Sequence, residues 1–214
     1  MKSLSILFLV SIAINCVAQD VHFSQFKISS FLLNPALVGS QNSDYKATLQ
    51  RKSQWESVSV PFNTFSLSLE GKEMLPSHSA GIQFLHDIAG DSRFKTTGIN
   101  LAYAKRIVAT TNNIFSIGAE LGLFQRSVMF DGLVFNEPEN LSNLNFMFPD
   151  VAIGIANFYE INKKMALESG IAFYHINKPK QSLTDNDAIR LHQKMNFHTA
   201  LNYSYTANLS MQPK

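Results

Sequence analysis

Apolar and polar side chains alternate in one segment after another along the chain. In residues 62–70, Phe65, Leu67 and Leu69 share one face, and Thr, Ser and Glu residues occupy the other. A period of two predicts β-strands, and each such segment has roughly the eight to twelve residues that cross a bilayer at a tilt. The same alternation predicts strands over residues 79–86, 97–105, 114–126, 151–159, 165–175 and 197–205.

The side chains opposite the apolar face are small or polar. They are Gly, Ala, Ser, Asn and Thr with an occasional Glu, whereas a soluble sandwich usually carries many Lys and Glu on its outer face. Short side chains suit a crowded barrel interior. The pattern therefore predicts an all-β fold, an antiparallel up-and-down transmembrane β-barrel with about eight to ten strands present. A soluble exported β protein, such as a lipocalin-like binder or an esterase, is the alternative.

Two kinds of connection separate the predicted strands. Short polar breaks are expected at residues 71–77, 110–113 and 162–163. Longer polar connections are expected at residues 88–94, 136–149 and 177–194. Outer-membrane barrels alternate in this way between tight periplasmic turns and longer outer loops. Aromatic residues near the strand ends are expected to form girdles at the membrane interfaces, among them Phe62, Tyr103, Phe124, Tyr159 and Tyr174.

Residues 1–18 have the layout of a secretory signal peptide. Lys2 precedes an apolar run over residues 4–14, and Ala18 closes the segment, so we expect cleavage after Ala18 or one residue later. The run is shorter than the roughly 20 residues of a transmembrane helix. Cys16, the only cysteine, lies inside it, so the mature chain is expected to hold no disulfide. The alternatives are a buried N-terminal helix and lipidation at Cys16.

Composition narrows the function only slightly. The chain has 214 residues, enough for one domain, and its formal net charge of +2 implies no nucleic-acid partner. Charged residues make up 16% of the chain, below the usual quarter or so. After the signal segment no run of 18 apolar residues occurs, which excludes helical membrane spans. Barrel strands escape this test, because only alternate residues in them are apolar.

Two motifs follow the signal segment. They are Gln19-Asp20-Val21-His22-Phe23-Ser24-Gln25-Phe26 and Leu33-Asn34-Pro35-Ala36-Leu37-Val38-Gly39. Shorter pieces come after them, including Gln54-Trp55. In this order they resemble the PorP/SprF family, outer-membrane β-barrel proteins of the type IX secretion and gliding machinery of Bacteroidota. We interpret Asn34-Pro35-Ala36 as a turn ahead of the first strand, because proline fixes its own backbone and restricts the residue before it.

The resemblance implies an organisation for the chain. Residues 1–18 are expected to be the signal peptide, residues 19–44 a periplasmic segment that carries the motif, and residues 45–214 an outer-membrane barrel. Family barrels have about fourteen strands, so we expect a truncated gene product or a fragment. A smaller barrel closed by the strands present is the alternative.

The resemblance also implies a role. It is a non-enzymatic one, in which the protein assists the export or surface attachment of a cargo protein or adhesin. The expected partners are type IX secretion components, that cargo and outer-membrane lipid, with no cofactor and no small-molecule substrate. An outer-membrane porin or hydrophobic-substrate channel is the second hypothesis.

Few residues suggest chemistry. The six histidines are scattered, without the i, i+4 spacing of a zinc enzyme, so no metal site is expected. Glu120 and Glu168 fall on the small-residue face and are expected in the lumen. There they form an interior ion pair with Arg126 or a selectivity element of a pore. The expected partner contacts are the motif residues Gln19, Asp20, His22, Phe23, Ser24, Gln25, Phe26, Asn34, Pro35, Ala36, Gly39, Gln54 and Trp55.

Overall fold

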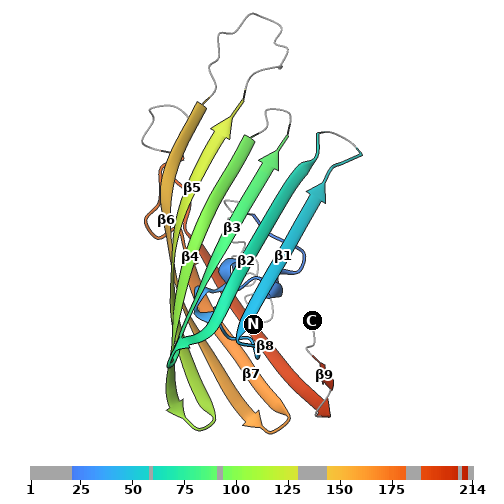
Figure 1. Cartoon of the computed structure of the whole chain (residues 1–214), viewed down its shortest axis with the longest axis vertical. Coiled ribbons are helices and arrows are strands. Elements are labelled where there is room, and N and C mark those ends of the chain that lie inside the picture. The colour runs from blue at the N-terminus through green and yellow to red at the C-terminus, as the bar shows by residue number, and fades with distance from the viewer. Residues whose placement is uncertain are drawn as a thin grey trace, which may run out of the picture.

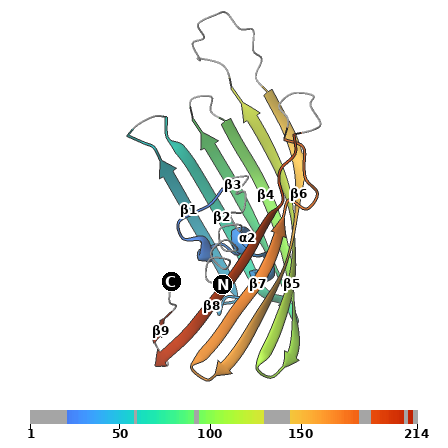
Figure 2. The same ribbon diagram turned by 180° about the vertical axis from the view of Figure 1, so that it is seen from behind.

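One antiparallel sheet makes up most of the protein. The computed structural model describes residues 21–57, 60–90, 94–129, 144–181, 189–206 and 209–211. Each strand pairs with the next along the chain, and the sheet curls into a half-barrel (Figures 1 and 2). The strands are β1 (Tyr45–Gln54), β2 (Phe62–Leu75), β3 (His78–Ala89), β4 (Phe94–Thr110), β5 (Asn113–Val128), β6 (Leu144–Asn162), β7 (Met165–Tyr174), β8 (Lys194–Thr206) and β9 (Leu209–Met211). The predicted all-β, antiparallel up-and-down fold is therefore confirmed.

The seven strands predicted from alternation are all present, and one of them starts much earlier than expected. Residues 136–149 were predicted as a connection, but β6 begins at Leu144. Pro149 lies inside this strand, and proline lacks the N–H of a strand ladder. In this part of β6, however, the strand pairs with β5 alone, since its pairing with β7 begins at Ile153. Proline is tolerated where its missing N–H faces no neighbouring strand.

The two ends of the sheet differ. The connections β2–β3, β4–β5 and β6–β7 have two residues each, at residues 76–77, 111–112 and 163–164, and meet at the lower end in Figure 1. We call this the tight-turn end, and the opposite end, where β1, β3, β5 and β7 finish, the long-loop end. The predicted alternation of short and long connections is confirmed. The first short break is tighter than expected, because β2 continues to Leu75.

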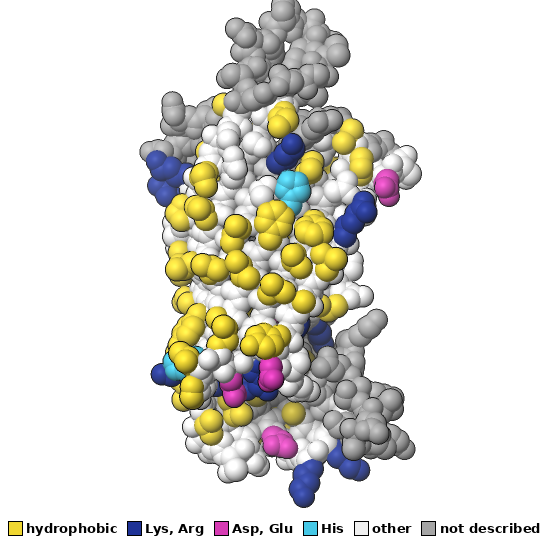
Figure 3. Space-filling view, in the orientation of Figure 1, with side chains coloured by type: hydrophobic (Ala, Val, Ile, Leu, Met, Phe, Trp, Pro, Cys, Tyr) yellow, Lys and Arg dark blue, Asp and Glu magenta, His cyan; other side chains and the backbone are white. Residues whose placement is uncertain are grey.

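The sheet is apolar outside and polar inside. On β2, Phe65, Leu67 and Leu69 are exposed outward, whereas Ser68 and Glu70 are each only 2% exposed on the inner face. Apolar side chains spread over the middle of the outer face, and charged ones lie toward its two ends (Figure 3). This distribution inverts that of a water-soluble sheet and suits contact with lipid.

No helix in the described part of the chain is long and apolar enough to cross a membrane.

The predicted aromatic girdle is only partly right. Tyr103 and Tyr159 are exposed on the outer face, as a girdle requires. Phe62, Phe124 and Tyr174 belong instead to the inward-facing series of their strands and line an internal cavity. Proximity to a strand end was the signal we used, but the alternation decides which face a side chain takes.

The core lies between the sheet and residues 21–39, which we call the plug. The plug holds three short helical turns, η1 (Phe26–Ile28), α2 (Ser30–Leu33) and η2 (Pro35–Leu37), inside the curl of the sheet (Figures 1 and 2). Plug residues share buried clusters with inward strand residues: Phe23 packs with Leu85, and Phe31 with Ala102. The sheet thus buries its inner face against its own N-terminal segment.

Candidate functional site: the plug and the cavity beside it

The Asn-Pro-Ala turn forms the centre of the plug. Asn34 has an extended backbone (φ −166°), and its Oδ1 accepts a hydrogen bond from the Ala36 N–H at 2.9 Å. Pro35 follows as the first residue of η2, where a missing N–H costs nothing. The prediction of a turn is confirmed, and Asn34 is fully buried.

Three inward glycines receive this turn, and we call them the glycine seat. Gly118, Gly154 and Gly170 lie on the neighbouring strands β5, β6 and β7. A Cβ atom at Gly118 would overlap the backbone at Ala36, and one at Gly154 or Gly170 would collide with the Asn34 amide. Glycine is therefore required at these positions for the plug to approach the sheet this closely.

Side-chain amides tie the plug to three strands. Asn34 Nδ2 donates to the carbonyl oxygens of Ile155 on β6, at 3.0 Å, and Ile171 on β7, at 3.3 Å. In the opposite direction, Asn196 on β8 donates to the plug carbonyl of Leu32 at 3.0 Å. These bonds join positions more than 100 residues apart in sequence, so they fix the plug to the far half of the sheet.

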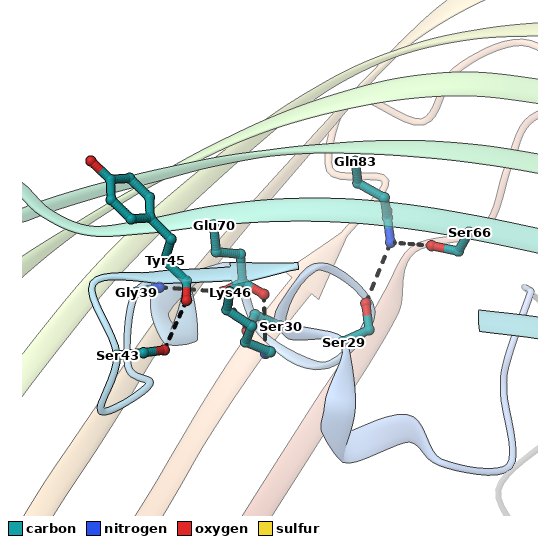
Figure 4. Close-up of polar contacts among 9 residues, drawn as sticks. All are labelled: Ser29, Ser30, Gly39, Ser43, Tyr45, Lys46, Ser66, Glu70 and Gln83. Atoms are coloured by element: carbon teal, nitrogen blue, oxygen red, sulfur yellow. Dashed lines mark hydrogen bonds and ion pairs between the residues drawn. The ribbon is translucent and has the colours of Figure 1, made fainter. Parts of the chain in front are cut away.

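Glu70 anchors the other end of the plug. Its Oε2 accepts from Ser30 Oγ at 2.9 Å and from the Gly39 N–H at 3.3 Å, and its Oε1 pairs with Lys46 Nζ at 3.1 Å (Figure 4). Gly39 has φ +75°, a conformation that glycine adopts without strain. Because the carboxylate is 2% exposed, these partners replace its lost hydration.

Gln83 continues the inner-face network on β3. Its Nε2 donates to Ser66 Oγ at 3.0 Å and to Ser29 Oγ of the plug at 3.3 Å (Figure 4). Its Oε1 accepts from Asn100 Nδ2 at 3.0 Å. The fully buried amide thus connects β2, β3, β4 and the plug.

A cavity of about 580 Å³ lies between the plug and the long-loop end. Phe31 and Leu32 of the plug and the aromatic Phe124 and Phe148 contribute apolar wall. Cationic side chains in its wall are Lys52, Arg126, Arg190 and Lys194. The volume falls within the roughly 300–1,000 Å³ of ligand pockets.

A buried His–Asp contact lies in the cavity wall. His175 Nδ1 lies 2.8 Å from Asp150 Oδ2, and both residues are more than nine-tenths buried. His175 also has φ +56°, a left-handed backbone that non-glycine residues adopt at a cost. The chain thus accepts local strain to place this pair at the end of β7.

The structure spreads the first motif along the plug. Gln19 and Asp20 lie outside the described residues. Phe23 is buried in the core, whereas Ser24, Gln25 and Phe26 are exposed. Two of the backbone carbonyls make contacts: Lys52 Nζ donates to His22 O at 3.0 Å, and Gln50 Nε2 donates to Gln25 O at 3.2 Å.

The remaining motif residues divide between the plug and the end of β1. Asn34, Pro35, Ala36 and Gly39 are all buried against the inner face. Gln54 borders the cavity, and Trp55 is 63% exposed in the connection after β1. Whether these residues contact a partner stays a prediction.

Of the three predicted lumen charges, Glu120 and Arg126 both lie on β5 and line the cavity. Glu120 is buried on the inner face, and Arg126 lies between the rings of Phe94 and Phe148, 5.2 and 5.3 Å from their centres. Glu168 Oε1 is 3.8 Å from His198 Nε2. Within the described residues, no group of three or more His, Cys, Asp or Glu side chains could hold a metal ion.

The sequence did not indicate that the plug and the sheet belong to one site. Glu70 and Gln83 are ordinary polar members of the alternating pattern on β2 and β3, and neither was predicted as a site residue. The inward glycines of β5, β6 and β7 were treated as ordinary small lumen residues. A usable signal existed: inward glycines on adjacent strands leave room for another segment.

Together, the inverted sheet, the filled interior and the tight-turn and long-loop ends define a β-stranded membrane protein with an internal plug. The family described as type IX secretion system membrane protein PorP/SprF matches residues 15–214. The chain therefore belongs to the PorP/SprF family and is a membrane component of the type IX secretion system. No curated protein and no solved structure matches the sequence.

Proposed function

We propose that this chain is a non-enzymatic outer-membrane component of type IX secretion that assists the export or surface attachment of a cargo protein. The tight-turn end faces the periplasm and the long-loop end faces outward, because barrels carry their long loops outside. Cargo and other type IX components are the partners, and lipid surrounds the outer face. The long-loop end, with its cavity, is the side that receives cargo.

The observation that supports this role is the anchored plug. A porin needs a water-filled passage along its inner face, whereas here hydrogen bonds hold the plug across that face. Asn34 of the plug donates to β6 and β7, and Glu70 on β2 and Gln83 on β3 bind the plug from the other half of the sheet. A filled interior favours a protein that holds a partner at its end over one that conducts solutes.

Deletion of the gene tests the role. We expect a deletion strain to lose one or a few surface or secreted proteins, and a wild-type copy to restore them, as measured by mass spectrometry of cell-surface and medium fractions. Uptake of small solutes should not change. An unchanged secretome together with altered solute uptake would refute the proposal and support the porin. Fractionation and heat-modifiable gel mobility check the membrane location separately.

A further inference from the structure

A polar row crosses the inner face at the cavity. In register, Gln83 on β3 pairs with Asn100 on β4, Asn100 with Gly122 on β5, and Gly122 with Asp150 on β6. Asn100 and Asp150 are 4% and 7% exposed, and both line the cavity. Because adjacent strands lie about 4.8 Å apart, these two side chains flank the bare position of Gly122.

Each of the two side chains has one buried oxygen that accepts no hydrogen bond within the described part of the chain. Asn100 donates through Nδ2 to Gln83, which orients the amide, and its Oδ1 extends to where a Cβ of Gly122 would stand. Asp150 uses Oδ2 for His175. Among the described residues, neither Asn100 Oδ1 nor Asp150 Oδ1 has a hydrogen-bond partner. Buried acceptors nearly always have a hydrogen-bond donor in native proteins, so we expect a donor to bind these two oxygens.

We propose that this row is a binding subsite for an N–H donor group, an ammonium or an amide, carried by a polypeptide segment that enters from the long-loop end. An ammonium offers three N–H donors and a side-chain amide offers two. Phe124 and Phe148, stacked 5.5 Å apart, supply apolar wall for the rest of the side chain. That the donor is carried by a polypeptide rests on the function proposed above. That the ligand is an N–H donor rests on the two oxygens alone.

The Phe124 ring covers the subsite. One side of the ring occupies the space that Cβ atoms would take at Gly98 and Gly122, and the ring also stacks on Phe148. We expect ligand entry to require the ring to turn about its side-chain bonds, away from Asn100 Oδ1.

Three short peptides test the donor chemistry on the purified full chain in detergent. They are acetyl-Phe-X-Phe-amides in which X is Lys, Gln or norleucine, so that only the head group of X changes. We expect calorimetric titration to give affinities about tenfold or more higher for the Lys and Gln peptides than for the norleucine peptide, the effect of a buried hydrogen bond to a charged or polar acceptor. Equal affinities for the three would overturn the proposal.

Variants then locate the subsite. Asn100→Leu should remove most of the preference for Lys and Gln, and Asp150→Asn should weaken the Lys peptide more than the Gln peptide. Asp87→Asn is the matched control, since Asp87 is a half-buried carboxylate on β3 outside the row, bonded to Thr64. Heat-modifiable mobility confirms folding of each variant. Should Asn100→Leu not fold, Asp150→Asn carries the test alone.

The outcomes separate this inference from the proposed function. A preference that survives in both row variants, or absent binding of all three peptides, would overturn the subsite. That result would leave the secretion role intact if the deletion strain still lost its cargo. Conversely, if the deletion strain has a normal secretome and the purified protein shows the expected peptide preference, the subsite stands and the secretion role is refuted.

Discussion

Asn34→Ala is the substitution that most directly tests how the plug is held. The change removes the two amide donations to Ile155 O and Ile171 O and the cap that Oδ1 provides for the Ala36 N–H. The backbone of the strands does not depend on Asn34. We therefore expect the plug to loosen while the sheet stays folded.

The expected loss follows from those three bonds. Each donated bond contributes about 0.5–1.5 kcal/mol, with the 3.3 Å bond at the low end. Loss of an Asn cap costs about 0.5–2 kcal/mol. The sum is about 1.5–4 kcal/mol in the free energy of local opening, which corresponds to about 12- to 700-fold faster exchange of the protected plug amides.

Hydrogen exchange in detergent or nanodiscs measures this directly. The reporters are the amides of Leu37 and Val38, which donate to the carbonyls of Asn34 and Pro35. Asn157→Ala is the matched control. Asn157 lies on β6, the strand of Ile155, and its side chain bonds Asn113 on β5, so the change removes a side-chain hydrogen bond without touching the plug bonds. Unchanged protection of the Leu37 and Val38 amides in Asn34→Ala, or equal loss in the control, would refute the anchoring role.

Three further substitutions address the seat, the carboxylate and the outer face. Gly154→Ala should displace the plug through its new Cβ, at a cost of about 1–3 kcal/mol, seen as faster exchange over residues 30–39 with the strands unchanged. Glu70→Ala should lower the free energy of plug opening by about 1–3 kcal/mol, because the buried donors Ser30 and Gly39 lose their acceptor. Adding Lys46→Met to this variant should not restore plug protection. In urea titrations of the protein in lipid vesicles, Leu67→Arg should lower the free energy of unfolding by about 2–4 kcal/mol, whereas Leu67→Phe should not. Equal stability of the two variants would refute lipid contact at this position.

The strands could be predicted because their signal is local. Alternation along β2 and β5 assigns every side chain to a face, and the small inward residues separate this sheet from a soluble one. The beginning of β6 was missed for the opposite reason. A strand can include Pro149 only where no second strand needs its N–H, and this depends on where the pairing of β6 with β7 begins.

The plug shows where local reasoning stops. The turn at Asn34 follows from the backbone of Pro35, and it was predicted correctly. Its contacts with Gly154 and Gly170 could not be, because nothing near Asn34 in sequence indicates which strands it will meet. Both motifs are predicted to contact partners, and the structure shows in addition that Phe23 of the first motif and Asn34, Pro35, Ala36 and Gly39 of the second are buried against the sheet. Part of their sequence specificity is therefore explained by folding alone.

The separation of plug and cavity along the strands has a functional consequence. The seat and Glu70 lie toward the tight-turn end, while the Asn100–Asp150 row lies on the cavity side of the plug. Gln83 touches both, because one end of its amide holds Ser29 and the other accepts from Asn100. A donor group that binds Asn100 Oδ1 therefore acts on an amide that already helps to hold the plug. Binding at the cavity should strengthen plug protection, so the Lys peptide should slow exchange of the Leu33 and Asn34 amides, which donate to the carbonyls of Ser29 and Ser30, in the wild type and not in Asn100→Leu.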